Sequence, residues 1–200
     1  MRNFSNSDFS TISNSELFGY ARRLYDSKQF ETSYAAYTEL ARRGYIACYV
    51  FLGMMNLEGK GTQQDSSLAL DWFKKAADVG SAEASYYCAR LLEKTGRTEE
   101  GIKYLRTSAS QAYAPAMCRL GKKLMTGCVV IPKNLENART LLLQAASSGN
   151  VFAKREVARL LTDRGNSALT QIYGWLRLMA AVGEAFVIAL VNPRSDRLKA

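Results

Sequence analysis

The segment LDWFKKAADVG, residues 70–80, places an aromatic pair, two adjacent alanines and a closing glycine within eleven residues. Weaker versions of this ending occur at LLLQAASSG (141–149) and GWLRLMAAVG (174–183). A local pattern that recurs with a period of roughly 20–50 residues is typical of proteins built from stacked repeats. The closing glycine therefore marks the end of a repeating unit.

Five marker positions follow one another at intervals of 32 to 37 residues. An alanine lies three residues before every marker, a large apolar residue lies seven before it, and a small residue lies eleven before it in four units of five. Because residues four apart share one helical face, this spacing predicts a closely packed helix that ends at a residue of positive φ. The markers are Gly44, Gly80, Ala112, Gly149 and Gly183.

Each unit is also predicted to contain a first helix that precedes the one ending at the marker, because a small residue recurs nine positions after the preceding marker. Neither helix could bury its apolar face alone, so the units must stack. The sequence predicts an all-α, right-handed superhelical solenoid of about five helix–turn–helix units within residues 15–192. The small residues of these first helices are Ala21, Gly53, Ala89, Gly121 and Ala158.

The stretch LGMMNLEGKGTQQDSSLALDWFKKAADVG, residues 52–80, resembles the Sel1-like repeat (SLR), a relative of the tetratricopeptide repeat. Residues 120–149 resemble it more weakly and carry one extra loop residue. The resemblance implies a solenoid fold and a non-catalytic interaction scaffold, most often bacterial. The matching positions are Leu52, Gly53, Gly59, Gly61, Asp65, Ala69, Trp72, Lys75, Ala76, Ala77 and Gly80, whereas Asn56 and Thr62 depart from the family pattern.

The two ends of the chain differ from the repeats. Residues 1–14 are rich in Ser and Asn and are expected to be poorly ordered, with Ser13 or Ser15 capping the first helix. EAFVIALV (184–191) is expected to form a separate C-terminal capping helix, followed by a polar tail at 193–200. We expect the chain to be complete rather than cut from a larger array.

The chain contains no histidine, which removes the usual general base, the common nucleophile pairs and the commonest metal ligand. We therefore predict no enzyme activity, no metal and no cofactor. The cysteines lack C-x-x-C spacing, and free thiols are favoured over a disulfide between Cys118 and Cys128. The cysteines are Cys48, Cys88, Cys118 and Cys128.

Two other motifs have structural interpretations. EGKGT (58–62) lacks the Ser or Thr and the upstream glycine of a phosphate loop, so it is interpreted as a tight turn before a helix capped by Asp65. The acids Glu93, Glu99 and Glu100 are interpreted as complementing a helix start rather than as a catalytic pair.

The aromatic residues Trp72 and Trp175 occupy equivalent repeat positions. They are interpreted as packing between helices, with a base-stacking platform as the alternative. No secretory signal is recognised, and no apolar run approaches the roughly 20 residues of a membrane helix. We expect a cytoplasmic monomer without membrane insertion.

The formal net charge of +9 favours acidic partners. The residue after the small position of the first helix is basic in four units of five; Arg23 and Lys123 extend this row, and Arg119 and Arg155 lie one turn upstream. Because this helix lines the concave surface of tetratricopeptide-like arrays, we expect a ladder of cations there; chance in a basic chain is the alternative. The predicted partner-binding residues are Arg22, Met54, Tyr87, Arg90, Arg119, Lys122, Lys123 and Arg159.

The predicted function is that of an adaptor or scaffold that holds an acidic protein segment in the groove. RNA or DNA bound through the same basic face is the alternative, and it would show a steep dependence on salt. An enzyme is the weakest alternative. Some secreted SLR proteins linked to cell-wall chemistry carry regularly paired cysteines, which this chain does not reproduce.

Overall fold

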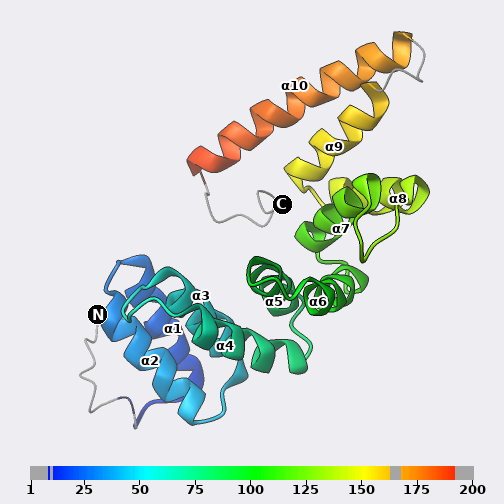
Figure 1. Ribbon diagram of the computed structural model, residues 1–200. Coiled ribbons are helices and arrows are strands. Elements are labelled where there is room, and N and C mark those ends of the chain that lie inside the picture. Colours follow the sequence, from blue (N-terminus) through cyan, green and yellow to red (C-terminus); the bar gives the residue numbers. More distant parts are fainter. Residues whose placement is uncertain (1–8, 10, 163–167, 192–200) are drawn as a thin grey trace. The chain divides into compact units, whose positions relative to one another are not determined.

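The computed structural model describes residues 9, 11–162 and 168–191, and every regular element within these ranges is helical, as predicted (Figure 1). The chain divides into two compact parts, unit 1 (residues 1–91) and unit 2 (residues 92–200). The boundary between them falls within a helix.

Unit 1 is built from antiparallel helix pairs joined by short turns (Figure 1). The first pair packs α1 on α2, the second packs α3 on α4, and a short 3-10 helix precedes α3. The elements are α1 (Asn14–Asp26), α2 (Phe30–Arg42), η2 (Ile46–Cys48), α3 (Tyr49–Glu58), α4 (Ser66–Asp78) and the larger part of α5 (Ala82–Lys94).

Unit 2 begins at the last turn of α5 and continues the alternation of helices. In it α7 packs on α8, and α9 packs on both α8 and α10. The elements are α6 (Thr98–Ser110), α7 (Ala114–Thr126), α8 (Leu135–Ser147), α9 (Val151–Thr162) and α10 (Ala168–Val191).

The predicted helix ends are confirmed at four of the five markers. Their φ angles lie between +58° and +90°, in the left-handed region. At the end of α4, Gly80 N–H donates to the carbonyl of Ala77 at 2.9 Å and Ser81 N–H donates to that of Ala76 at 3.0 Å. This pair of bonds satisfies carbonyls that the helix leaves unpaired, as expected where a helix ends at a residue of positive φ.

The predicted pairing of small and large residues is also confirmed. A Cβ atom added to Gly53 of α3 would lie 2.6 Å from the ring of Phe73 in α4. In unit 2, a Cβ at Gly121 of α7 would lie 2.8 Å from Cγ of Leu142 in α8. The large side chain of the second helix therefore packs directly on the backbone of the first, at the same repeat position in both units.

The fifth marker does not end a helix. Gly183 lies inside α10, which runs without a break for 24 residues, so the separate capping helix expected at 184–191 is a wrong prediction. The continuous helix contains an apolar stretch, Ile172–Ala189, that is long enough and apolar enough to cross a membrane by length and composition. The expectation that no segment reaches this length is therefore also wrong.

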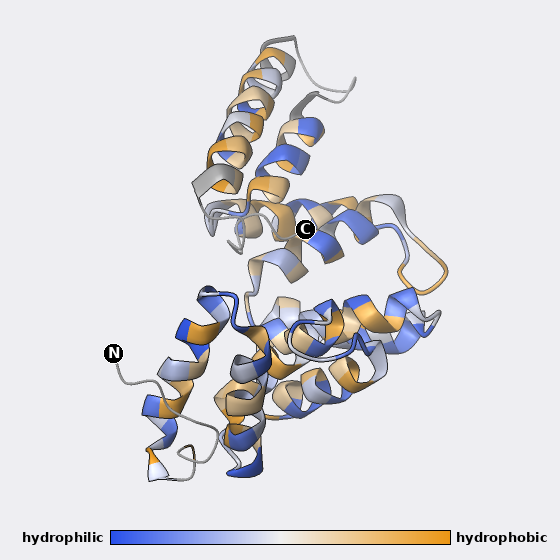
Figure 2. Cartoon of the chain, turned by 90° about the vertical axis from the view of Figure 1, so that its left-hand side faces the viewer, coloured by the Kyte–Doolittle hydropathy of each residue, from blue (hydrophilic) through white to orange (hydrophobic). Residues whose placement is uncertain are grey.

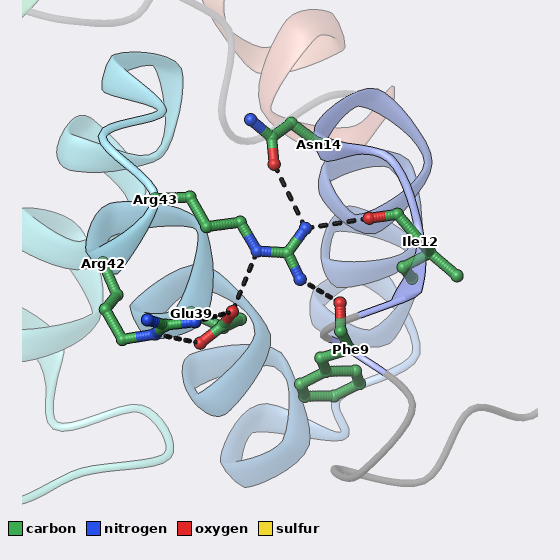
Figure 3. Close-up of polar contacts among 6 residues, drawn as sticks. All are labelled: Phe9, Ile12, Asn14, Glu39, Arg42 and Arg43. Atoms are coloured by element: carbon green, nitrogen blue, oxygen red, sulfur yellow. Dashed lines mark hydrogen bonds and ion pairs between the residues drawn. The ribbon is translucent and has the colours of Figure 1, made fainter.

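The described part of the N-terminal segment is fixed by Arg43 (Figure 3). Its guanidinium donates to the carbonyl of Ile12 at 2.8 Å and to that of Phe9, and its Nε donates to Glu39 at 2.8 Å. Ser13 caps α1, as one of the two predicted candidates. Poor order of residues 1–14 stays a prediction, and residues 1–8 and 10 and the tail 193–200 lie outside the described residues.

The loop between α3 and α4 has the structural role predicted for EGKGT. Lys60 forms an ion pair with Glu58 and donates to the hydroxyl of Tyr25 at 3.2 Å. Asp65 accepts hydrogen bonds from the first N–H groups of α4, which confirms the predicted cap. All four cysteines are free thiols, as favoured from the sequence; three are buried and Cys128 is exposed.

Candidate cationic site on helices α7 and α9

The charge of the chain is distributed unevenly between the two units. Residues 92–200 contain 17 Lys and Arg against 8 Asp and Glu, whereas residues 1–91 contain ten of each. The whole net charge of +9 therefore belongs to unit 2. An acidic partner attracted by charge would be drawn to unit 2.

Helix α7 presents three cations on one face, because Arg119, Lys122 and Lys123 are spaced three and four residues apart. Arg119 Nη2 lies 2.7 Å and Lys123 Nζ lies 3.4 Å from carboxylate oxygens of Glu93. Glu93 occupies the last turn of α5, and its side chain is only 11% exposed. Its interpretation as an acid at a helix start is wrong, because it is the counter-ion of the α7 cations.

Helix α9 repeats this arrangement around a second shielded carboxylate. The side chain of Glu156 is 5% exposed and lies 3.3 Å from Arg155 Nη2 and 3.5 Å from Arg159 Nη1. The guanidinium of Arg155 also lies over the ring of Phe152, 5.1 Å from its centroid. Two arginines are thus held in place by one acid, and most of Arg159 remains exposed to solvent.

The charges of α7 and α9 meet around Cys118 of α7. Burial raises the pKa of this thiol to about 11, and the charges of Lys122, Glu156 and Arg155 also act on it. Lys122 of α7 and Arg155 of α9 therefore lie near the same thiol, and we name the cations of the two helices together the α7–α9 cationic patch. It consists of Arg119, Lys122, Lys123, Arg155 and Arg159.

Five cations share two carboxylates in this patch, so it keeps an excess of positive charge. Lys122 and Arg159 are its exposed members. The Nε atoms of Arg119 and Arg155 are buried and have no hydrogen-bond partner among the described residues. The exposed cations Lys122 and Arg159 are the ones that can donate hydrogen bonds to a partner's carboxylates or phosphates.

The structure places the predicted residues of unit 1 in different surroundings. Arg22 and Arg90 are exposed, Arg90 lying 5.8 Å from the ring centroid of Tyr86, and Met54 is half-buried. Tyr87 is 5% exposed and stacks on Phe73 with ring centroids 4.9 Å apart. Its predicted apolar contact with a partner is therefore corrected to a core position.

The sequence predicted the cations of the patch but not the acids that hold them. Arg155 lies one turn before Arg159, a spacing that places both on one helical face. Glu93 and Glu156 could not be recognised as the acids that position the arginines, because their burial depends on neighbouring helices. The two tryptophans differ from each other. The ring of Trp72 packs on that of Tyr49 with centroids 5.5 Å apart, which agrees with its interpretation as packing between helices, but Trp175 is 59% exposed.

Comparisons with known proteins identify the repeats. A family model described as the Sel1 repeat matches residues 46–81 and 114–150, which contain α3–α4 and α7–α8. No curated protein matches the chain in sequence. Sel1 repeats generally serve as protein–protein interaction scaffolds.

Solved structures share the fold at low sequence identity. The protective antigen c5321 of uropathogenic Escherichia coli, which displays an SLR fold, matches with a TM-score of 0.76 and 17% identity over 90% of this chain and 41% of its own. A Sel1 repeat protein from Oxalobacter formigenes matches with a TM-score of 0.73 and 21% sequence identity, over 84% of this chain and 68% of its own. MamA matches with a TM-score of 0.53 and 16% sequence identity, over 84% of this chain and 96% of its own.

These likenesses confirm the predicted class of fold, an SLR and tetratricopeptide-like solenoid. The chain spans less than half the length of c5321.

Proposed function

We propose that this chain, whose residues 46–81 and 114–150 are Sel1 repeats, is a non-catalytic scaffold that binds an acidic protein segment through the α7–α9 cationic patch. The observation that carries the proposal is that the patch already binds carboxylates of its own chain. Glu93 and Glu156 are each held by two cations, and the patch still has cations in excess. A partner's Asp or Glu would meet the same chemistry at Lys122 and Arg159.

The internal carboxylates also favour tight binding by fixing the cations beforehand. A long basic side chain normally loses rotamer freedom when it binds, and this loss weakens the complex. Arg155 and Arg159 are already restrained by Glu156, so less freedom remains to be lost. The exposed cations of unit 1, Arg22 and Arg90, remain predicted contacts of the same kind.

Fluorescence anisotropy with a labelled peptide of alternating Glu and Ser would test the proposal on the full chain. The double variant Lys122→Glu/Arg159→Glu should weaken binding by about tenfold or more, because it replaces attraction with repulsion in the patch. The matched control is Lys133→Glu/Arg139→Glu. It makes the same change in net charge at exposed positions on and just before α8, outside the patch.

The control should bind the peptide within about twofold of the unmodified chain at moderate salt, where distant charges are screened. Equal losses in the two variants would show that only net charge matters and would refute the patch as the site. Circular dichroism of both variants would establish that the helices are intact.

Nucleic acid is the second candidate, because arginines also bind phosphates. A single-stranded RNA of mixed sequence, measured in the same assay at low and high salt, separates the two. For single strands the logarithm of affinity falls with that of salt by about 0.7 for each phosphate neutralised. RNA binding that is tighter than peptide binding, and that is lost in Lys122→Glu/Arg159→Glu, would favour the alternative.

A further inference from the structure

The outer face of α10 carries a large exposed apolar surface. Eight large hydrophobic side chains on this helix are between 51% and 67% exposed, and apolar residues recur along the long helix at the top of Figure 2. An exposed apolar area of this kind normally marks an interaction surface. The residues are Ile172, Tyr173, Trp175, Leu176, Met179, Val182, Phe186 and Val187.

The opposite face of α10 is the one that packs inward. Leu178, Ala185 and Ile188 are partly buried and Ala181 is 3% exposed, at spacings that place them on one side of the helix. Lys154 of α9 forms an ion pair with Glu184 at 2.6 Å. The orientation of α10 on α9 is therefore defined, and the exposed apolar side chains are directed away from α9.

Charged residues are confined to one flank of α10. The apolar window Ile172–Ala189 contains only Arg177 and Glu184, which are seven residues, or about two turns, apart and so lie on the same side of the helix. The outer face between the aromatic side chains and Val187 has no charge. Water is therefore in contact with an apolar surface that is bordered on one flank by Arg177 and Glu184.

We propose that the outer face of α10 docks on the surface of an anionic lipid bilayer, with the helix lying parallel to the membrane. Two common kinds of apolar helix do not fit. A core helix of a soluble protein is mostly buried, whereas only 11% of this window is buried. A signal sequence lies near an N-terminus, whereas this window begins at residue 172.

Parallel docking fits the neighbouring charges better than spanning does. α9 carries Lys154, Arg155, Glu156 and Arg159, and the Lys154–Glu184 ion pair joins it to α10. Crossing the bilayer would bring these charges into hydrocarbon or separate α10 from α9. A helix that lies in the interface buries only its apolar face, about 5–10 Å deep, and leaves flanking charges among the headgroups.

An anionic surface suits the charge of this part of the chain. Unit 2 has 17 basic against 8 acidic residues, so negative headgroups would attract it before the apolar face inserts. Trp175 and Tyr173, both exposed, have the amphipathic rings that favour the boundary between headgroups and acyl chains. This inference goes beyond the proposed function and can fail independently of it, because the side chains that would insert belong to α10 and none of them belongs to the α7–α9 cationic patch.

Vesicle flotation of the full chain tests the proposal. It should float with vesicles of phosphatidylcholine and phosphatidylglycerol and much less with phosphatidylcholine alone. Leu176→Gln/Phe186→Gln should reduce partitioning into the anionic vesicles by about tenfold or more, since two inserted side chains become polar. The matched control Leu135→Gln/Leu143→Gln changes exposed leucines of α8 and should float like the unmodified chain.

Trp175 supplies a direct measure of depth. The chain has two tryptophans, so Trp72→Phe leaves Trp175 as the single emitter. Its emission should shift to the blue with anionic vesicles, and lipids brominated near the headgroup should quench it more than lipids brominated near the chain ends. If Trp72→Phe lowers stability, the difference between the unmodified chain and Trp175→Phe gives the same signal.

Four results would overturn the proposal. They are no flotation, equal flotation with the two kinds of vesicle, equal flotation of the α10 and α8 variants, and strongest quenching from the chain ends. Light scattering without lipid measures the oligomeric state, and so tests whether a second copy of the chain covers the outer face of α10. A dimer that becomes monomeric in Leu176→Gln/Phe186→Gln would assign the face to self-association and would also overturn membrane docking.

Discussion

Unit 1 and unit 2 are built from the same helix pair, but they differ in charge and in the side chains that fill the repeat. Unit 1 has as many acidic as basic residues, whereas unit 2 has an excess of nine basic residues. A row of ring–ring contacts, from Phe9–Tyr20 to Tyr86–Tyr87, lies within unit 1. In unit 2 the position of Phe73 is occupied by Leu105 and Leu142, both fully buried.

This difference shows how little of the surface the repeat specifies. The repeat requires a small residue, a large residue and a helix end in a fixed phase, because these positions control how closely the helices approach. The remaining positions are free to vary. In unit 1 these positions supply aromatic packing. In unit 2 they supply the cationic patch and the exposed apolar face of α10.

The largest expected effect on stability comes from truncating the large buried side chain of the repeat, Phe73 in unit 1 and Leu142 in unit 2. Phe73→Ala in unit 1 should lower the free energy of unfolding by about 4 kcal/mol, and Leu142→Ala in unit 2 by about 3 kcal/mol, because the phenyl group leaves the larger cavity and Tyr87 loses its stacking partner. Urea unfolding followed by circular dichroism measures both. A larger loss of unfolding free energy for Leu142→Ala than for Phe73→Ala would contradict the expectation that the aromatic contacts of unit 1 stabilise it more.

The second test uses the loop after the first helix of a pair. A Cβ on Gly61 would lie 2.2 Å from the carbonyl oxygen of Phe30, and Gly61 has a φ of +70°. Gly61→Ala should therefore destabilise the chain by about 2–3 kcal/mol. The matched position in unit 2 is Val129, which is fully exposed, so Val129→Ala should change stability by less than about 0.5 kcal/mol. Similar losses for the two variants, measured by thermal unfolding, would remove this difference between the units.

The third test is the pH dependence of Glu39. Hydrogen bonds from Arg42 and Arg43 lower the pKa of this carboxyl from 4.5 to about 2. Because the folded pKa is depressed, the stabilisation is complete above pH 4.5 and is lost as the pH falls toward 2. Unit 2 has Thr107 and Gln144 at this repeat position, which do not titrate in this range.

Glu39→Gln should cost about 1 kcal/mol at neutral pH, since the carboxylate lies near the surface. The difference in unfolding free energy between the two proteins should shrink between pH 4.5 and 2. Urea unfolding at several pH values measures it. A difference that does not change with pH would mean that Glu39 acts through packing rather than through its charge.

The smallest expected effect is a stabilisation of unit 2. Ala112 has a φ of +58°, a conformation that is unfavourable for a residue with a Cβ, whereas the markers of unit 1 are glycines. Ala112→Gly should raise the free energy of unfolding by about 0.5 kcal/mol, because the relief of strain exceeds the added entropy of the unfolded chain. The reverse change, Gly149→Ala, is the control and should destabilise by about 1 kcal/mol. Scanning calorimetry of the two variants would detect shifts of opposite sign.

The sequence predicted features that depend on local spacing. Gly53 beneath Phe73 and the bond from Gly80 to Ala77 follow from residue spacings within one helix pair. Gly183 shows the limit of this approach, because glycine permits a positive φ but does not require it. Inside α10 its backbone continues the helix, so one long apolar helix forms where two short ones were expected.

The amino-acid sequence by itself determined the period of the repeat, the helical class and four of the five marked helix ends, because these depend on steric preferences of neighbouring residues. Tertiary structure decided which side chains are buried. It shielded Glu93 and Glu156 beside basic side chains, placed Tyr87 in the core and left Trp175 in water. Burial depends on the helices that pack against a residue, and the identity of those neighbours is not a property of its local sequence.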